Sequence, residues 1–192
     1  MQLTATARRK TFEADIFRTQ GEVDIVGPKE WYAIYTRHHH EKVVAHHLEA
    51  LGFEVYLPLR TEVHQWKDRH KMIVMPLFPS YVFFIGDLKR RFEILNVPSV
   101  RFLVGSAGKA ATIPESELAA VRRIVEIRKH VEPHPFLRRG ERARIHTGPL
   151  AGIEGIVVRK KDSLSLVLSV ELLGRSVAIG VDEADVETIS GA

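Results

Sequence analysis

Histidine is the residue type in this sequence whose spacing comes nearest to a chemical motif. The chain has ten histidines. If residues 39–51 are helical, His40 and His47 lie two turns apart on one face, and His39 and His46 share a neighbouring face. No Asp or Cys completes a ligand pattern, and Val44 stands where a His-Glu-x-x-His zinc motif needs its second histidine. We therefore predict no metal site.

Other patterns of catalytic residues are also missing from the sequence. There is no Ser-His-Asp signature, no P-loop and no pair of carboxylates at a motif spacing. The chain has no cysteine, so thiol chemistry and disulfides are excluded. We predict a protein that binds partners, with no catalytic residue and no cofactor.

A basic loop is the first candidate for binding. Arg37, His38, His39 and His40 lie between a predicted strand and a predicted helix. Arginine and the N-terminus of a helix both favour phosphate groups, which points to a nucleic acid. The alternative is a loop that is simply solvated. The basic runs at 67–71 and 89–91 are weaker candidates of the same kind.

Aromatic residues form the second candidate. Residues 76–84 read Pro-Leu-Phe-Pro-Ser-Tyr-Val-Phe-Phe, a strand entered through two prolines. Alternation places Tyr81 and Phe83 on one face of this strand and Val82 and Phe84 on the other. One face must pack on helices, and the other can carry aromatic side chains to a partner. The alternative is that both faces belong to the core. The aromatic residues that we select are Tyr35, Phe78, Tyr81, Phe83 and Phe102.

Composition and charge are consistent with a binding protein. The chain is 45% hydrophobic and 27% charged, which is typical of a globular protein. Residues 29–132 carry sixteen basic and twelve acidic side chains, so the whole net charge of +4 lies there. No apolar run approaches the roughly 18 residues that a membrane span needs. Arg8, Arg9 and Lys10 are not followed by the apolar segment of a secretory signal. We expect a cytoplasmic monomer without membrane contact.

The first two thirds of the chain alternate between strand and helix patterns. This order predicts an α+β fold in which one sheet carries helices. A helix at 39–51 is expected to bury Val43, Val44, His47, Leu48 and Leu51, and to end before Gly52. The expected strands are 31–36, 53–60, 80–85 and 100–104. A hairpin arm is expected to pair 62–66 with 71–75. Two further helices are expected at 88–95 and 114–129.

The last third has a different pattern. Residues 132–135 read Glu-Pro-His-Pro, which cannot continue a helix and which we interpret as part of a linker. Residues 147–158 contain Gly148, Gly152 and Gly155, which predict turn geometry between short strands. Short strands separated by turns predict a small β-barrel, with strands at 142–146, 155–160, 164–171, 176–181 and 186–189.

Five motifs in order make the chain similar to the NusG family of transcription factors. They are Trp31-Tyr32, the Phe-Pro-x-Tyr core in 77–82, residues 96–100, a KOW motif at 148–155 and a Gly-Arg segment at 172–175. General NusG proteins usually have glycine where Ser80 stands, and phenylalanine is common at the positions of Ile153 and Leu173. These departures favour the specialised, RfaH-like paralogues.

The resemblance implies an organisation of the chain. It implies a NusG N-terminal domain, an α/β sandwich, at 29–130, a linker at 131–138 and a five-stranded KOW β-barrel at 139–192. We expect residues 1–28 to be a disordered tail, because they show no sustained periodicity.

The resemblance also implies a function, that of a transcription elongation factor that suppresses pausing and termination. Tyr35, Phe78, Tyr81, Phe83 and Phe102 would bind the clamp helices of the largest subunit of RNA polymerase. By position, residues 91–94 would touch the second large subunit. Arg37, His38 and His39 would contact the non-template DNA strand. Ile153, Leu172, Leu173 and Arg175 would recruit a ribosomal protein or the Rho factor.

Two other classes of function stay open on the sequence. One is a KOW-domain protein that binds RNA or the ribosome and has no role with polymerase. The net neutral charge of residues 133–192, with eight basic and eight acidic side chains, counts against it. The other is a metal-dependent nuclease, which the incomplete histidine pattern disfavours.

Overall fold

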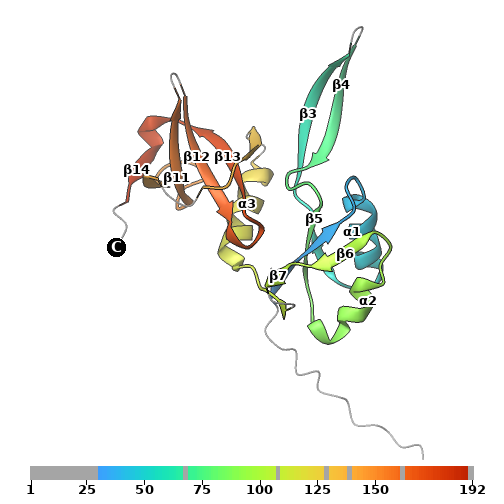
Figure 1. Ribbon diagram of the computed structural model, residues 1–192. Helices are drawn as coiled ribbons and strands as arrows, with labels where there is room; N and C mark the ends of the chain where they lie inside the picture. The colour runs from blue at the N-terminus through green and yellow to red at the C-terminus, as the bar shows by residue number, and fades with distance from the viewer. Residues whose placement is uncertain are drawn as a thin grey trace, which may run out of the picture.

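The computed structural model describes residues 30–66, 69–106, 109–127, 130–137, 140–160 and 163–189. The expected tail at 1–28 lies outside these ranges. Two sheets dominate the fold, one in each half of the chain, and helix α3 lies beside the second sheet (Figure 1). No helix in the described ranges is long and apolar enough to cross a bilayer.

The N-terminal sheet has four antiparallel strands in the order β2-β5-β1-β6. The prediction of an α+β fold is confirmed for this half, since helices pack on the sheet. The elements of this part are β1 (Trp31–Thr36), α1 (Glu41–Ala50), β2 (Glu54–Tyr56), β5 (Tyr81–Ile85), the 3-10 turn η1 (Leu88–Arg90), α2 (Arg91–Leu95) and β6 (Val100–Leu103). A short hairpin, β7 (Gly105–Ser106) with β8 (Lys109–Ala110), follows β6.

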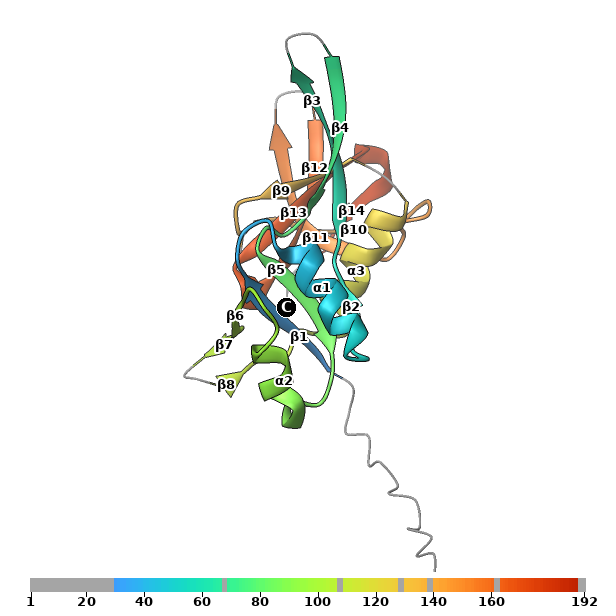
Figure 2. The same cartoon turned by 90° about the vertical axis from the view of Figure 1, so that its right-hand side faces the viewer.

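Alternation along β1 and β5 gives this sheet two apolar faces. Tyr32, Ile34, Val82 and Phe84 lie on the face that packs against α1 and α2. Trp31 and Phe83 lie on the opposite face, with Tyr35 and Tyr81. Figure 2 shows α1 lying across the sheet. Because both faces are covered, the strands read as nearly continuous apolar runs in the sequence.

Helix α1 buries a different face from the one predicted. Its buried residues are Glu41, Val44, Ala45 and Leu48, whereas Val43, His47 and Leu51 are exposed. The prediction missed Glu41, because a carboxylate is normally placed on the solvent side. Gly52 follows the helix with a φ of +82°, the left-handed conformation expected of a glycine at that position.

A hairpin arm projects from this half of the molecule (Figures 1 and 2). It pairs β3 (Leu59–Trp66) with β4 (Arg69–Pro76), as the sequence predicted. Lys42 of α1 donates a hydrogen bond of 3.0 Å to the carbonyl of Val74 at the base of the arm. Val63 and Met72 face each other across the ladder and are largely exposed.

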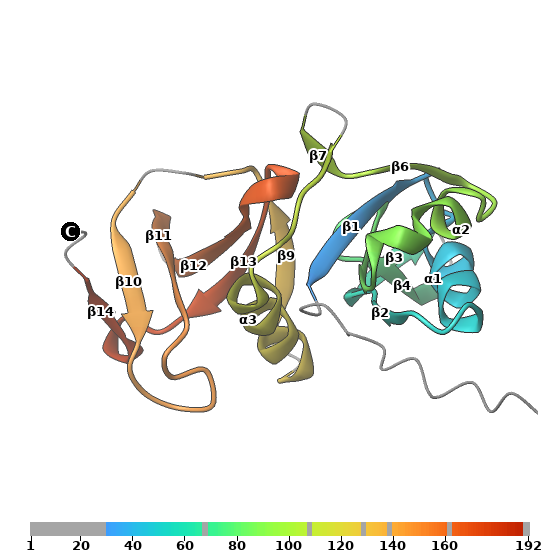
Figure 3. The same ribbon diagram turned by 90° about the horizontal axis from the view of Figure 1, so that it is seen from below.

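Helix α3 (Glu115–Glu126) contacts both halves of the molecule. Its residues Leu118, Val121 and Ile124 belong to one apolar cluster that runs from the N-terminal sheet to the C-terminal sheet. Seen from below, α3 lies beside β9 and β13, between the second sheet and β1 (Figure 3). The sequence placed this helix with the N-terminal sheet alone, because periodicity identifies a buried face but not what covers it.

The C-terminal sheet has six antiparallel strands in the order β14-β10-β11-β12-β13-β9. All five predicted strands are present. The strands are β9 (Val131–His134), β10 (Arg142–Ile145), β11 (Glu154–Lys160), β12 (Ser163–Val170), β13 (Arg175–Val181) and β14 (Val186–Thr188), with 3-10 turns η2 (Glu171–Leu173) and η3 (Glu183–Asp185).

The sixth strand corrects the expected linker. Residues 131–134 form β9 and pair with β13, so a linker at 131–138 is wrong for its first four residues. A proline excludes a helix interior, but it is tolerated in an edge strand, and β9 is the edge of this sheet. Pro133 pairs with Val177 there, and Val131 is buried.

Candidate binding surface at one end of the N-terminal sheet

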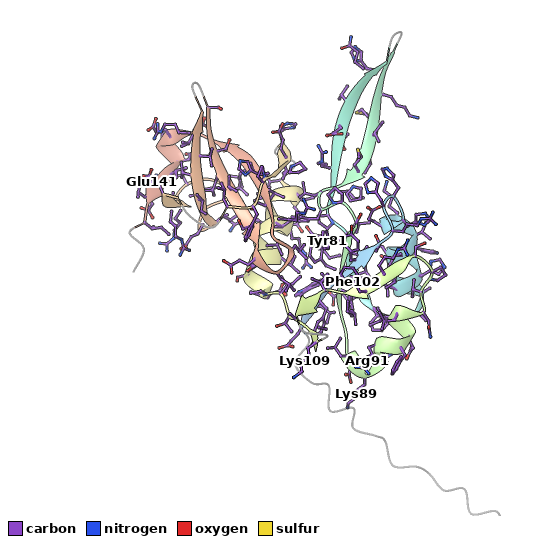
Figure 4. All side chains as sticks on the ribbon, in the orientation of Figure 1. Tyr81, Lys89, Arg91, Phe102, Lys109 and Glu141 are labelled. Atoms are coloured by element: carbon purple, nitrogen blue, oxygen red, sulfur yellow. The ribbon has the colours of Figure 1, made fainter. Side chains whose placement is uncertain are left out.

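Three aromatic side chains meet at one end of the N-terminal sheet. Tyr35 of β1 pairs with Tyr81 of β5 on one side and with Phe102 of β6 on the other. The ring centroids of Tyr35 and Phe102 are 5.0 Å apart and nearly parallel, and those of Tyr35 and Tyr81 are 5.3 Å apart in an edge arrangement. Figure 4 shows Tyr81 and Phe102 close together in this region. We refer to these three residues as the aromatic triad.

Exposure increases across the aromatic triad. Phe102 is 51% exposed, whereas Tyr35 and Tyr81 are half-buried. A phenylalanine that leaves half of its surface in water, stacked on a tyrosine, is a candidate contact for a partner. The sequence predicted all three residues for the candidate site, and the structure brings them together.

The other two predicted aromatic residues do not reach the surface. Phe78 is 2% exposed and Phe83 is fully buried, and their rings meet edge to face with centroids 5.6 Å apart. Tyr56 packs on the other side of Phe83, at 6.2 Å. Phe78 and Phe83 belong to the buried cluster against which Tyr35 and Tyr81 pack. The alternation that put Tyr81 and Phe83 on one face was correct, but it cannot tell a covered position from an open one.

The basic loop predicted from the sequence begins where β1 ends. Arg37, His38 and His39 are all exposed, directly after Tyr35 and Thr36. The rings of His38 and His39 have centroids 3.8 Å apart, and His39 has a φ of +63°. The loop and the aromatic triad therefore occupy the same end of the sheet.

A buried carboxylate holds the backbone beneath this surface. Glu41 is 2% exposed, and its Oε1 accepts a hydrogen bond of 2.7 Å from the backbone N–H of Ser80. Ser80 directly precedes Tyr81, so this bond fixes the entry to β5. The sequence analysis missed Glu41, and its only signal was a charge among the helical positions that face the core.

His40 and His47, which the sequence placed on one helix face, have separate hydrogen-bond partners. The Nδ1 of His40 lies 2.9 Å from the hydroxyl of Ser99, and the Nδ1 of His47 lies 2.8 Å from the carbonyl of Val43. Within the described ranges, no three His, Cys, Asp or Glu side chains are grouped as metal ligands.

Comparison with known proteins gives this surface its context. Residues 29–122 match the family described as Transcription termination factor nusG. Proteins named Transcription termination/antitermination protein NusG from Staphylococcus epidermidis and from Staphylococcus aureus are each 28% identical over 180 residues, which cover 85% of this chain and 98% of theirs. The chain belongs to the NusG family.

The fold agrees with a solved structure from the same family. The structure described as "Domain interaction in Thermotoga maritima NusG" aligns with a TM-score of 0.53 and 21% identity, over 84% of this chain and 98% of that one. The aromatic triad, the basic loop and Glu41 all lie within the residues that match the NusG family.

The candidate residues of the C-terminal half are less accessible than the NusG resemblance implied. Ile153 and Leu173 are 5% and 8% exposed, so both belong to the apolar cluster. Leu172 is half-buried and Arg175 is exposed, near the left-handed Gly174. The structure therefore leaves Leu172 and Arg175 as the accessible members of this predicted set.

The remaining basic runs lie elsewhere. Lys89 and Arg91 are drawn at the lower end of the N-terminal half, away from Tyr81 (Figure 4). The guanidinium of Arg91 lies 4.9 Å from the ring centre of Phe92, which is 65% exposed. Part of the run at 67–71 lies outside the described residues.

Proposed function

We propose that this NusG-family protein is a specialised transcription elongation factor that binds RNA polymerase and suppresses pausing and termination. Support comes from the relatives, which are named for transcription termination and antitermination. A role in transcription is the broad part of this proposal. The specialised, RfaH-like role is the finer part, and it rests on the sequence departures at Ser80, Ile153 and Leu173.

The aromatic triad is the observation that carries the polymerase contact. It combines an exposed Phe102 with two half-buried tyrosines on three adjacent strands, which gives an aromatic contact surface. Buried aromatic anchors supply much of the binding energy at protein interfaces. We assign this contact to the clamp helices of the largest polymerase subunit, because an apolar groove or patch is suited to the face of a helix.

The basic loop would serve a second contact. Arg37, His38 and His39 are exposed and lie beside the aromatic triad. A factor bound through the triad would thus present a guanidinium and two adjacent imidazole rings to its neighbour on the polymerase. Guanidinium groups favour phosphates and flat rings stack on bases, so we assign the loop to the non-template DNA strand.

The C-terminal half would recruit a further protein. Leu172 and Arg175 are the candidate residues that remain accessible. We assign them to a ribosomal protein or to Rho. In this conformation Ile153 and Leu173 stabilise the fold and do not contact the partner directly.

A pulldown with purified core RNA polymerase tests the main proposal. Wild type should retain polymerase, and the Tyr81→Ala/Phe102→Ala variant should bind about a hundredfold more weakly, because two aromatic anchors are lost. Met72→Ala is the matched control, since it removes an apolar side chain that is 74% exposed on the arm. A folded double variant with wild-type affinity would refute the interface. Failure of the wild type to bind polymerase, together with RNA binding, would favour a KOW-type RNA-binding role.

A further inference from the structure

Residues 78–81 form a tight turn with an unusual residue at its third position. The N–H of Tyr81 donates a 3.2 Å hydrogen bond to the carbonyl of Phe78, Pro79 occupies the second position, and Ser80 has a φ of +69°. These are the features of a type II turn, whose third position normally takes glycine because a positive φ is strained in other residues. Ser80 is also 5% exposed, so its side chain is directed into the structure.

Residues 97–100 repeat the same arrangement. The N–H of Val100 donates a 3.1 Å hydrogen bond to the carbonyl of Val97, Pro98 occupies the second position, and Ser99 has a φ of +74°. Two Pro-Ser turns thus precede β5 and β6, the two strands that flank β1 in one sheet. The turn itself would form more easily with glycine at both positions, so turn geometry does not explain the serines.

Both serines bind the basic loop through their backbone. The carbonyl of Ser80 accepts a 2.8 Å hydrogen bond from the N–H of Thr36, and that of Ser99 accepts one of 2.8 Å from the N–H of Arg37. The loop is therefore tied to both turns at consecutive residues. Glycine would provide the same carbonyls.

The hydroxyls add something that glycine lacks. The Oγ of Ser80 lies 3.4 Å from the Nδ1 of His38, and the Oγ of Ser99 lies 2.9 Å from the Nδ1 of His40. These two rings flank His39, which itself has a positive φ. Within the described ranges, His39, Ser80 and Ser99 are the non-glycine residues with positive φ, and all three belong to this one loop and its two turns. Backbone strain gathered at one place is typical of a binding site.

We propose that Ser80 and Ser99 are positioning residues that hold the basic loop in the shape in which it binds single-stranded nucleic acid. This inference rests on the proposed DNA contact of Arg37, His38 and His39. Each serine also directly precedes a strand of the aromatic triad, Ser80 that of Tyr81 and Ser99 that of Phe102. The two turns therefore fix the loop and the aromatic triad relative to each other.

Replacing both serines by glycine separates positioning from stability. The Ser80→Gly/Ser99→Gly variant keeps the turns and removes the strain, so its melting temperature should equal or exceed that of the wild type by a few degrees. Its affinity for single-stranded DNA should nevertheless fall about tenfold, since the hydroxyls no longer hold His38 and His40 in place. The measurement is fluorescence anisotropy with a fluorescein-labelled oligonucleotide at fixed salt. A merely structural role predicts no loss of affinity when stability is retained.

The matched control is the Ser80→Ala/Ser99→Ala variant. It keeps the strained backbone and also lacks the hydroxyls, so it should bind DNA as weakly as the glycine variant but melt at a lower temperature. This agreement in affinity would exclude the added flexibility of glycine as the cause. Arg37→Ala, added to either double serine variant, should weaken DNA binding further and reduce its salt dependence.

The outcomes separate this inference from the proposed function. Wild-type DNA affinity in either double variant would overturn the positioning role. A wild-type protein that binds core polymerase but no single-stranded DNA would also overturn it, while leaving the polymerase contact intact. A wild type whose DNA affinity falls in both double variants, but which does not bind polymerase, would support the inference and overturn the proposed polymerase contact.

Discussion

At the scale of single residues, two phenylalanines of the same sheet have different roles. Phe83 is fully buried between Phe78 and Tyr56, whereas Phe102 is half exposed on the edge of the aromatic triad. The sequence placed both in one predicted interface. Sequence alone cannot separate the two, because aromatic residues in strands occur both in cores and on contact surfaces. The difference depends on which element covers each face of the sheet.

Alanine substitutions at these two positions should have opposite effects. Phe83→Ala should lower the free energy of unfolding by about 3–5 kcal/mol, because it leaves a cavity in the core. Phe102→Ala should change stability by less than about 1 kcal/mol but weaken polymerase binding. Urea denaturation and a binding titration on the same samples give both values. If Phe102→Ala destabilises as much as Phe83→Ala, the aromatic triad is core and not contact surface.

Glu41 offers a second test at this scale. Its carboxylate is buried and accepts the N–H of Ser80, so Glu41→Ala leaves that donor without its partner. The expected loss of unfolding free energy is about 1–3 kcal/mol. Glu41→Gln keeps an acceptor oxygen and should lose less. Hydrogen exchange at the Ser80 amide should be faster in Glu41→Ala than in Glu41→Gln, and equal rates would contradict the assigned role.

At the scale of elements, periodicity predicted most of the fold. The strands, α1, α3 and the arm were found because apolar positions repeat with the period of a helix or a strand. The errors share one cause. The buried face of α1 was misassigned because Glu41 is a core residue, and β9 was missed because Pro133 was taken to exclude all regular structure. Both depend on tertiary partners, Ser80 in one case and β13 in the other.

The contact of α3 with the C-terminal sheet should depend on pH through Glu117. Its Oε2 accepts a 3.2 Å hydrogen bond from the N–H of Glu171. Burial raises the pKa of Glu117 above its ordinary value of 4.5, this hydrogen bond opposes the rise, and the charge of Glu171 adds to it. The folded protein thus holds the proton more tightly than the unfolded chain does. The resulting stabilisation is present at low pH and is lost as the pH rises through the raised pKa.

Glu117→Gln should remove the loss of stability that the wild type shows as the pH rises, because glutamine stays neutral. Its melting temperature should exceed that of the wild type by a few degrees near pH 7, and the difference should close towards about pH 4. Glu54→Gln, at an exposed position on β2, is the control and should show no such divergence. A difference that is constant with pH would show that the carboxyl does not titrate at this contact.

At the scale of the whole molecule, one apolar cluster joins the two halves through α3. On the N-terminal side, the guanidinium of Arg122 lies 4.9 Å from the ring centre of Tyr56 and 5.3 Å from that of Trp31, whose indole N–H bonds to Glu115. Burial raises the pKa of Tyr56 to about 12, so its phenol stays neutral.

On the other side of α3, Arg123 binds the C-terminal half. Its guanidinium donates hydrogen bonds of 2.9 Å to the carbonyls of Pro149 and Ala151. The helix is thus held from both sides. The sequence could not show this, because the contacts join residues that are far apart in the chain.

These contacts predict which fragments of the chain are stable. A fragment of residues 139–192, the C-terminal unit expected from the sequence, lacks α3 and β9. It would expose the side of β12 that α3 covers and the edge of β13 that β9 pairs with. A fragment of residues 114–192 keeps both α3 and β9.

Each fully buried apolar side chain contributes about 1.5–3 kcal/mol, and the longer fragment retains Leu118, Val121, Ile124 and Val131. That sum is comparable with the whole stability of a small domain, about 5–15 kcal/mol. The longer fragment should therefore unfold cooperatively, while the shorter one should melt at a much lower temperature or lack a transition. Circular dichroism melts of the two fragments decide the point, and equal melting temperatures would show that α3 adds nothing to the C-terminal sheet.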